Sequence, residues 1–130
     1  MKLEHIGIAV KSIEDKLKIW RDILGLKRHI IQEVPDQKVR IAVLEMGDIH
    51  IELIEPTDTH SNVHKFIEKR GEGLHHLCFE VEDIEAILSN MKKNGIKLID
   101  EVPRKGAYAE KIAFIHPKDM GGVLIELCER

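Results

Sequence analysis

The stretch His5-Ile6-Gly7-Ile8-Ala9-Val10 returns 71 residues later as His76-Leu77-Cys78-Phe79-Glu80-Val81. Further along, after three inserted residues, Ile51-Glu52-Leu53 is matched by Ile125-Glu126-Leu127. Self-similarity at a nearly fixed spacing is the signature of an internal duplication. The sequence therefore indicates that one structural unit is present twice.

Each copy, at about residues 1–56 and 73–130, is predicted to form a βαβββ unit. After its first strand, each copy has apolar side chains at helical spacing followed by a glycine stop. These are Ile13, Leu17, Trp20, Leu24 and Gly25 in the first copy, and Ile84, Leu88, Met91 and Gly95 in the second. Strands are expected at about residues 27–33, 38–46, 49–55, 97–101, 109–115 and 121–128, with a connecting helix at about 61–70. The predicted fold class is α+β, with two repeated βαβββ modules forming a curved mixed sheet in a single domain over residues 1–130.

Composition excludes several classes of partner and compartment. The net charge of -3 and the pI near 6.2 give no basic field that would attract nucleic acid or an anionic membrane surface. No run approaches the roughly 18 apolar residues of a membrane span, and no signal segment is recognisable. The two cysteines lie in strand-like runs, as small hydrophobic residues do in a reducing compartment. We therefore expect a cytoplasmic protein that binds neither nucleic acid nor membranes.

The motifs of several enzyme classes are absent from the sequence. It has no glycine-rich phosphate loop, no serine at a strand-turn-helix elbow and no CxxC pair. Nucleotide hydrolysis and serine hydrolase chemistry are therefore set aside.

The repeated histidine is predicted to face away from the helix of its unit. Because side chains alternate along a strand, Ile6, Ile8 and Val10 share one apolar face and His5 lies on the other. The same alternation places His76 opposite the apolar face of the second copy. Both histidines are therefore expected on the concave side of the sheet.

The repeated glutamates lie in unusual surroundings for a carboxylate. Glu52 and Glu126 each have large aliphatic neighbours on both sides in the last strand of their copy. A carboxylate in such a run costs several kcal/mol unless a cation or strong donors meet it, and a metal ion also recruits imidazole. The sequence thus predicts a metal site formed by His5, Glu52, His76 and Glu126. Taken singly, each of these residues is more often packed or solvated than a ligand, and the case depends on the duplication.

The other histidines are weaker candidates. His75 is expected to have a structural role, because it should point away from His76. His50 precedes Glu52 by two residues, and it either shares the face of Glu52 and lines the cleft or lies at the rim. Both readings of His50 stay open from the sequence.

The duplicated unit with one histidine and one glutamate in each half resembles the vicinal oxygen chelate superfamily. Within that superfamily the chain is most similar to the methylmalonyl-CoA epimerases. The discriminating stretches are Gly73-Leu74-His75-His76 and the run at residues 116–127, His-Pro-Lys-Asp-Met-Gly-Gly-Val-Leu-Ile-Glu-Leu. The resemblance implies the metal ligands His5, Glu52 (where some members carry Gln), His76 and Glu126. It also implies a divalent ion, cobalt first, with nickel, zinc or manganese as alternatives, and a homodimer.

The activity implied by the resemblance is a metal-dependent epimerase that moves the C2 proton of methylmalonyl-CoA through a metal-stabilised enolate. Its partner is then a small acyl-CoA substrate, and Glu126 acts as both ligand and base. A bacterial member of the family has a second catalytic glutamate at the position of Ile41, and Glu45 is a weak substitute, so the second base is not identified. Three lysines, Lys105, Lys111 and Lys118, are either contacts for the coenzyme A phosphates or part of a solvated basic rim.

Three alternatives to the epimerase remain. Glyoxalase I, which acts on the hemithioacetal of glutathione, uses the same four ligands. A non-catalytic ligand-binding protein of the same fold would normally have lost part of the set. A ring-cleaving dioxygenase usually keeps two histidines and one carboxylate.

Overall fold

The computed structural model describes residues 1–107 and 109–130, which fall into two compact units. The N-terminal unit comprises residues 5–75, and the C-terminal unit comprises residues 76–130 together with residues 1–4. Within the described residues, no helix is both long enough and apolar enough to cross a lipid bilayer. Because each unit contains one copy of the repeat, the two are described in turn.

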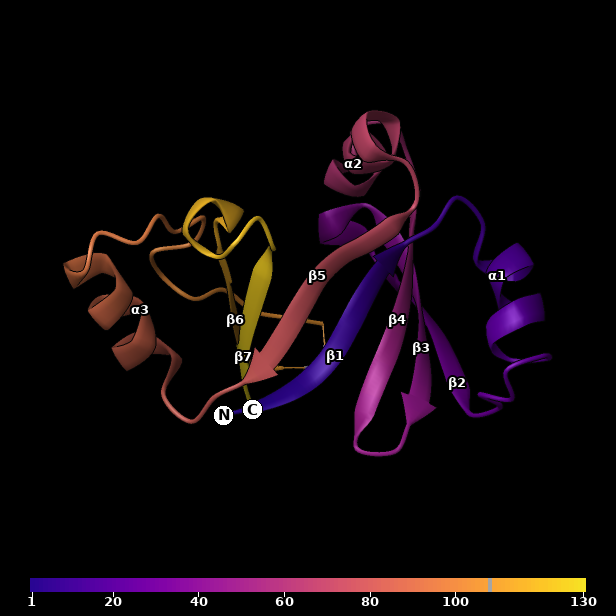
Figure 1. Ribbon diagram of the computed structural model, residues 1–130, viewed down its shortest axis with the longest axis horizontal. Helices are drawn as coiled ribbons and strands as arrows, with labels where there is room; N and C mark the ends of the chain where they lie inside the picture. Colours follow the sequence, from indigo (N-terminus) through magenta and orange to yellow (C-terminus); the bar gives the residue numbers. More distant parts are fainter. Residues whose placement is uncertain (108) are drawn as a thin grey trace. The chain divides into compact units, whose positions relative to one another are not determined.

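The N-terminal unit is a four-stranded sheet with two helices (Figure 1). In sheet order its strands are β2-β3-β4-β1; β1 runs parallel to β4, and the other pairs are antiparallel. The elements are β1 (Lys2–Ala9), α1 (Ile13–Trp20), β2 (His29–Val34), a 3-10 turn (Pro35–Gln37), β3 (Val39–Met46), β4 (Ile49–Pro56) and α2 (Asn62–Arg70). The predicted strands and the connecting helix of this copy are therefore confirmed within two residues.

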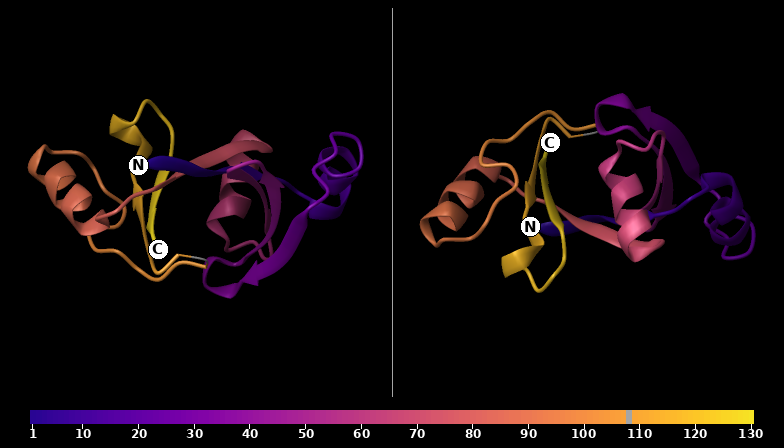
Figure 2. Two further views of the ribbon diagram at one scale, coloured as in Figure 1. Left: turned by 90° about the horizontal axis from the view of Figure 1, so that it is seen from below. Right: turned by 90° about the horizontal axis from the view of Figure 1, so that it is seen from above.

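The two helices of this unit cover opposite faces of its sheet (Figure 2). Ile13 and Leu17 of α1 pack with Val10, Leu44 and Leu53 on one face. On the other face, Val63 and Phe66 of α2 pack with Ala9, Val39, Ile41, Val43 and Ile54. The predicted alternation along β1 is confirmed, because Val10 and Ala9 belong to different clusters.

Helix α1 ends earlier than predicted. Ser12 caps its start by accepting a hydrogen bond from the Asp15 N–H, as expected. After Trp20, the Leu24 N–H bonds to the Ile19 carbonyl, five residues back, so the last turn widens and the chain leaves the helix. The placement of Leu24 on the helix stripe was therefore wrong, and its side chain is 62% exposed.

In the part of the C-terminal unit that the structure describes, there are three strands and one α-helix (Figure 1). Strand β5 (Gly73–Glu80) runs parallel to β7 (Ile125–Glu129), which pairs with antiparallel β6 (Lys111–Ile115). Helix α3 (Ile84–Lys93) packs Ile84 and Leu88 on this sheet, and a 3-10 turn (Pro117–Asp119) precedes β7. The helix stripe is confirmed. Strand β7 begins later than residue 121, because Gly121 and Gly122 both adopt positive φ angles in a turn.

The strand predicted at about residues 97–101 is not a regular strand. Leu98 forms a single bridge with Ile115, and the next contact along β6 is made by a side chain, because Asp100 Oδ2 accepts the Phe114 N–H at 2.9 Å. The Phe114 carbonyl accepts hydrogen bonds from both Ile99 and Asp100. A carboxylate thus takes the place of a ladder hydrogen bond, which the apolar pattern of the sequence could not reveal.

Each unit contains the same helix–strand clamp, which we define as a strand-end glutamate that accepts the first helical N–H. Glu55 accepts from Ile13 at 2.9 Å, and Glu129 accepts from Ile84 at 3.0 Å. A cation completes each clamp by forming ion pairs with the strand-end glutamate and with a glutamate in the first helical turn. In the N-terminal unit Arg40 pairs with Glu55 and Glu14. In the C-terminal unit Lys111 pairs with Glu129 and Glu85. The clamps fix β4 and β7, the strands of Glu52 and Glu126, to their helices.

Candidate metal and proton-transfer site

His5 and Glu52 form a buried pair in the N-terminal unit. Strands β1 and β4 pair Gly7 with Glu52. Because Gly7 is two residues beyond His5, the side chains of Glu52 and His5 lie on the same face of the sheet. His5 Nδ1 is 3.2 Å from Glu52 Oε2, and the residues are 6% and 7% exposed. The prediction that His5 faces away from α1 is confirmed within this unit, and Glu52 lies on the same face as His5.

His76 and Glu126 form the equivalent pair in the C-terminal unit. Here β5 and β7 place Cys78 opposite Glu126, again two residues beyond the histidine. His76 Nε2 is 3.1 Å from Glu126 Oε1, and the residues are 5% and 9% exposed. Both copies of the repeat therefore hold one imidazole and one carboxylate in the same strand register and at nearly the same separation.

The donor chemistry of each pair fits a divalent transition metal. Imidazole nitrogen and carboxylate oxygen bind such ions at about 2.1 Å, which places two ligands of one ion about 3.0 Å apart at a right angle and about 3.4 Å apart at a tetrahedral angle. The observed separations of 3.1 and 3.2 Å are of this size. A direct histidine–glutamate ion pair has a similar spacing, so the separations fit the metal without requiring it.

The position expected for a second base is apolar. Ile41 of β3 is buried among Val39, Val43 and Ile54, so it can neither accept nor donate a proton. Glu45, on the same face of β3, is exposed and pairs with Arg28 at 3.2 Å.

His50 lies on the same face of β4 as Glu52. This was one of the two positions that the sequence left open for His50. It is opposite His5 on one side and Glu45 on the other, and it is partly buried. His5 and Glu52 share one face of the sheet formed by β1, β3 and β4. Among the described residues of these strands, the other titratable side chains on that face are those of Glu45 and His50.

An aromatic ring lines the pair of the C-terminal unit. Phe114 of β6 is opposite Glu126, and its ring is edge-on to His76 with centroids 6.0 Å apart. The Arg104 guanidinium lies over the Phe114 ring, 5.5 Å from its centroid. Sequence reasoning missed Arg104, because it belongs to an aperiodic segment with no motif of its own.

The two cysteines pack together in the core of the C-terminal unit. Cys78 and Cys128 are both free and buried. A hydrogen bond with Cys128, together with burial, raises the pKa of the Cys78 thiol, so Cys78 stays protonated and unreactive. The prediction that they are small core residues is confirmed.

His75 and His116 also have structural contacts. The His75 ring is edge-on to Phe66 of α2, with centroids 4.9 Å apart. His116 Nδ1 accepts the Lys118 N–H and so orders the turn before β7. The contact of His75 agrees with the structural role expected of it.

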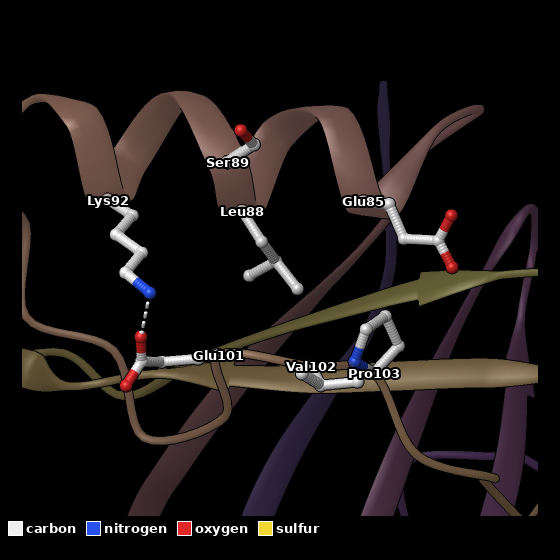
Figure 3. A pocket seen from close by; sticks show the side chains of 7 residues that line it. All are labelled: Glu85, Leu88, Ser89, Lys92, Glu101, Val102 and Pro103. Atoms are coloured by element: carbon white, nitrogen blue, oxygen red, sulfur yellow. Dashed lines mark ion pairs between the residues drawn. The ribbon is translucent and has the colours of Figure 1, made fainter.

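A surface hollow of about 320 Å³ lies elsewhere in the C-terminal unit, between α3 and residues 101–103 (Figure 3). Leu88 points into it, and Lys92 closes one end through its ion pair with Glu101 at 2.6 Å. Its lining includes none of the four predicted ligands. We assign it no part in the chemistry.

Comparison with known proteins identifies the family. Residues 4–114 match the model of the Glyoxalase/Bleomycin resistance protein/Dioxygenase superfamily. An ethylmalonyl-CoA/methylmalonyl-CoA epimerase of Cereibacter sphaeroides is 35% identical over 128 residues, covering 97% of this chain and 96% of the relative.

Two solved structures extend the likeness to three dimensions. The crystal structure of methylmalonyl-CoA epimerase from Mycobacterium tuberculosis is 38% identical, with a TM-score of 0.89 over 98% of this chain and 87% of that one. A Streptomyces coelicolor methylmalonyl-CoA epimerase variant in complex with 2-nitronate-propionyl-CoA is 32% identical, with a TM-score of 0.91 over 99% and 94%. The chain therefore belongs to the Glyoxalase/Bleomycin resistance protein/Dioxygenase superfamily and, within it, to the methylmalonyl-CoA epimerase family of isomerases.

Proposed function

We propose that this chain interconverts the two C2 epimers of methylmalonyl-CoA, using one divalent ion held by His5, Glu52, His76 and Glu126. The observation that carries the proposal is the buried histidine–glutamate pair, present once in each unit in the same register. The relatives named for this reaction, one of them solved with an acyl-CoA ligand, support the substrate class. Cobalt is the first choice of ion, with nickel, zinc or manganese as alternatives.

The bound ion would supply Lewis-acid stabilisation of the charge that develops on the thioester carbonyl oxygen when C2 loses its proton. The family resemblance implies that Glu126 takes this proton, and the side chain of Glu126 is shielded from water. The low exposure of all four side chains strengthens their electrostatic effect on the reacting group. Inversion then requires that a proton return to C2 from the opposite face.

The decisive experiment is proton exchange in deuterated water. Cobalt-loaded protein is incubated with methylmalonyl-CoA, and loss of the C2–H signal is followed by NMR. We expect exchange that depends on the metal and stops when it is chelated. Conversion of the glutathione hemithioacetal without C2 exchange would instead identify a glyoxalase I. Binding of the acyl-CoA without any turnover would identify a ligand-binding protein.

We also propose that the enzyme is a cytoplasmic homodimer. The buried free thiols of Cys78 and Cys128 suit a reducing compartment. The dimer is proposed from the family resemblance. Size-exclusion chromatography with light scattering should give twice the chain mass of 14.9 kDa, and a mass of one chain would contradict the proposal.

A further inference from the structure

Arg104 is fixed beside β6 by its backbone. Its N–H donates to the Ile112 carbonyl at 2.9 Å, and its own carbonyl accepts the Ile112 N–H at 2.7 Å. This bridge does not involve the side chain. A substitution of the side chain therefore leaves the path of the backbone supported.

The guanidinium of Arg104 is oriented by two further contacts. It lies 5.5 Å from the centroid of the Phe114 ring, within the range of a cation–π interaction. Its Nε is 3.6 Å from Oδ2 of Asp100, and the same oxygen accepts the Phe114 N–H at 2.9 Å. The side chain is nevertheless 51% exposed, so the oriented guanidinium remains accessible from solvent.

Phe114 links this cation to the histidine–glutamate pair of the same unit. Because Phe114 and Glu126 are opposite each other in β6 and β7, their side chains share a face, and the Phe114 ring is edge-on to His76. Arg104 is thus one aromatic ring away from the pair. A preorganised guanidinium at this place is suited to a planar anionic group on a molecule bound at the pair.

We propose that Arg104 binds the C2 carboxylate of the substrate and thereby selects methylmalonyl-CoA over thioesters that lack this group. The inference rests on the function proposed above. The carboxylate is attached to the reacting carbon, whereas the coenzyme A phosphates lie at the far end of the pantetheine arm. Arg104, one aromatic ring away from the pair, is therefore placed for the carboxylate, and the phosphates are the alternative source of the same charge.

The test is equilibrium binding by calorimetry, with cobalt-loaded protein and two matched ligands. An equilibrium mixture of methylmalonyl-CoA epimers undergoes no net turnover, and propionyl-CoA is the same thioester without the carboxylate. Arg104→Gln should bind methylmalonyl-CoA about 10- to 100-fold more weakly than wild type, the usual cost of losing a charged hydrogen bond. Its affinity for propionyl-CoA should be unchanged within about twofold. Arg104→Lys should retain part of the preference.

Arg21→Gln serves as the matched control, because Arg21 pairs with Asp22 in the turn after α1 and carries the same charge. It should bind both ligands as wild type does. Circular dichroism and thermal melting check that each variant folds.

Three results would overturn the inference. Arg104→Gln could leave the affinity for methylmalonyl-CoA unchanged, or it could lower the affinity for methylmalonyl-CoA and for propionyl-CoA equally. It could also leave the affinity for methylmalonyl-pantetheine unchanged when this ester replaces the coenzyme A ester. The last result would assign Arg104 to a phosphate, because the pantetheine ester lacks the nucleotide. Failure of the proposed function is distinct, because wild-type protein would then show no exchange of the C2 proton.

Discussion

His76 Nε2 lies 3.1 Å from Glu126 Oε1, and both residues are buried in the sheet of the C-terminal unit. If Glu126 both binds the ion and removes the C2 proton, Glu126→Gln should lose part of the metal and nearly all of the exchange. We expect a decrease in exchange rate of at least about 100-fold, the usual contribution of a positioned base. Metal analysis and NMR exchange measure the two effects. Glu110→Gln, at an exposed site, is the control, and full activity in Glu126→Gln would disprove its role.

Glu52 is the repeat counterpart of Glu126 but is proposed to be a ligand only. An amide oxygen can still coordinate an ion, so Glu52→Gln should keep exchange within about tenfold of wild type, whereas Glu52→Ala should lose the metal. The comparison of the two glutamine variants, Glu52→Gln and Glu126→Gln, therefore separates ligand from base. Equal losses in both would show that the two glutamates have the same role.

Metal binding should stabilise the folded chain. An ion that binds the native state alone adds stability in proportion to the logarithm of its concentration over Kd. We expect cobalt to raise Tm by several degrees in wild type, since about 1 kcal/mol corresponds to a few degrees in a domain of this size. Glu126→Ala should show little of this increase. A cobalt-independent Tm in wild type, measured by differential scanning calorimetry, would argue against a site formed on folding.

The helix–strand clamps should contribute to stability without touching the chemistry. Glu55→Ala removes the acceptor of the Ile13 N–H and should cost about 1–2 kcal/mol, as the loss of a helix cap does. Glu129→Ala should cost a similar amount in the other unit. Denaturant unfolding measures both, with exposed Glu82→Ala as the control. A clamp variant that is as stable as wild type would show that the cation pairs alone hold the helix.

Much of the site was predictable because it depends on local pattern. The offset between the repeats predicts that Glu52 and Glu126 are equivalent, and strand alternation predicts that His5 lies on the face opposite Ile8. The structure confirms the equivalent strand register of each glutamate within its own unit, and it confirms the face of His5 within the N-terminal unit. The convergence of all four side chains on one ion, and a single domain over residues 1–130, stay predictions.

The features that the sequence did not predict depend on tertiary contacts. Leu24 leaves the stripe of α1 because the last helical turn widens, and this depends on backbone hydrogen bonds that side-chain spacing does not encode. Arg104 approaches Phe114 because its backbone bridges Ile112 of β6 and its side chain pairs with Asp100. Neither arrangement has a period in the sequence.

The central claim is that the pairs of the two units bind one ion together. Equilibrium titration of the metal-free protein with cobalt, followed by calorimetry, tests this most directly when wild type is compared with His5→Ala and His76→Ala. The account predicts one ion per chain in wild type and an affinity at least about 100-fold lower in either variant, because removing a ligand should cost more than disturbing the groups that orient it. Two ions per chain, or unchanged affinity in either variant, would contradict it.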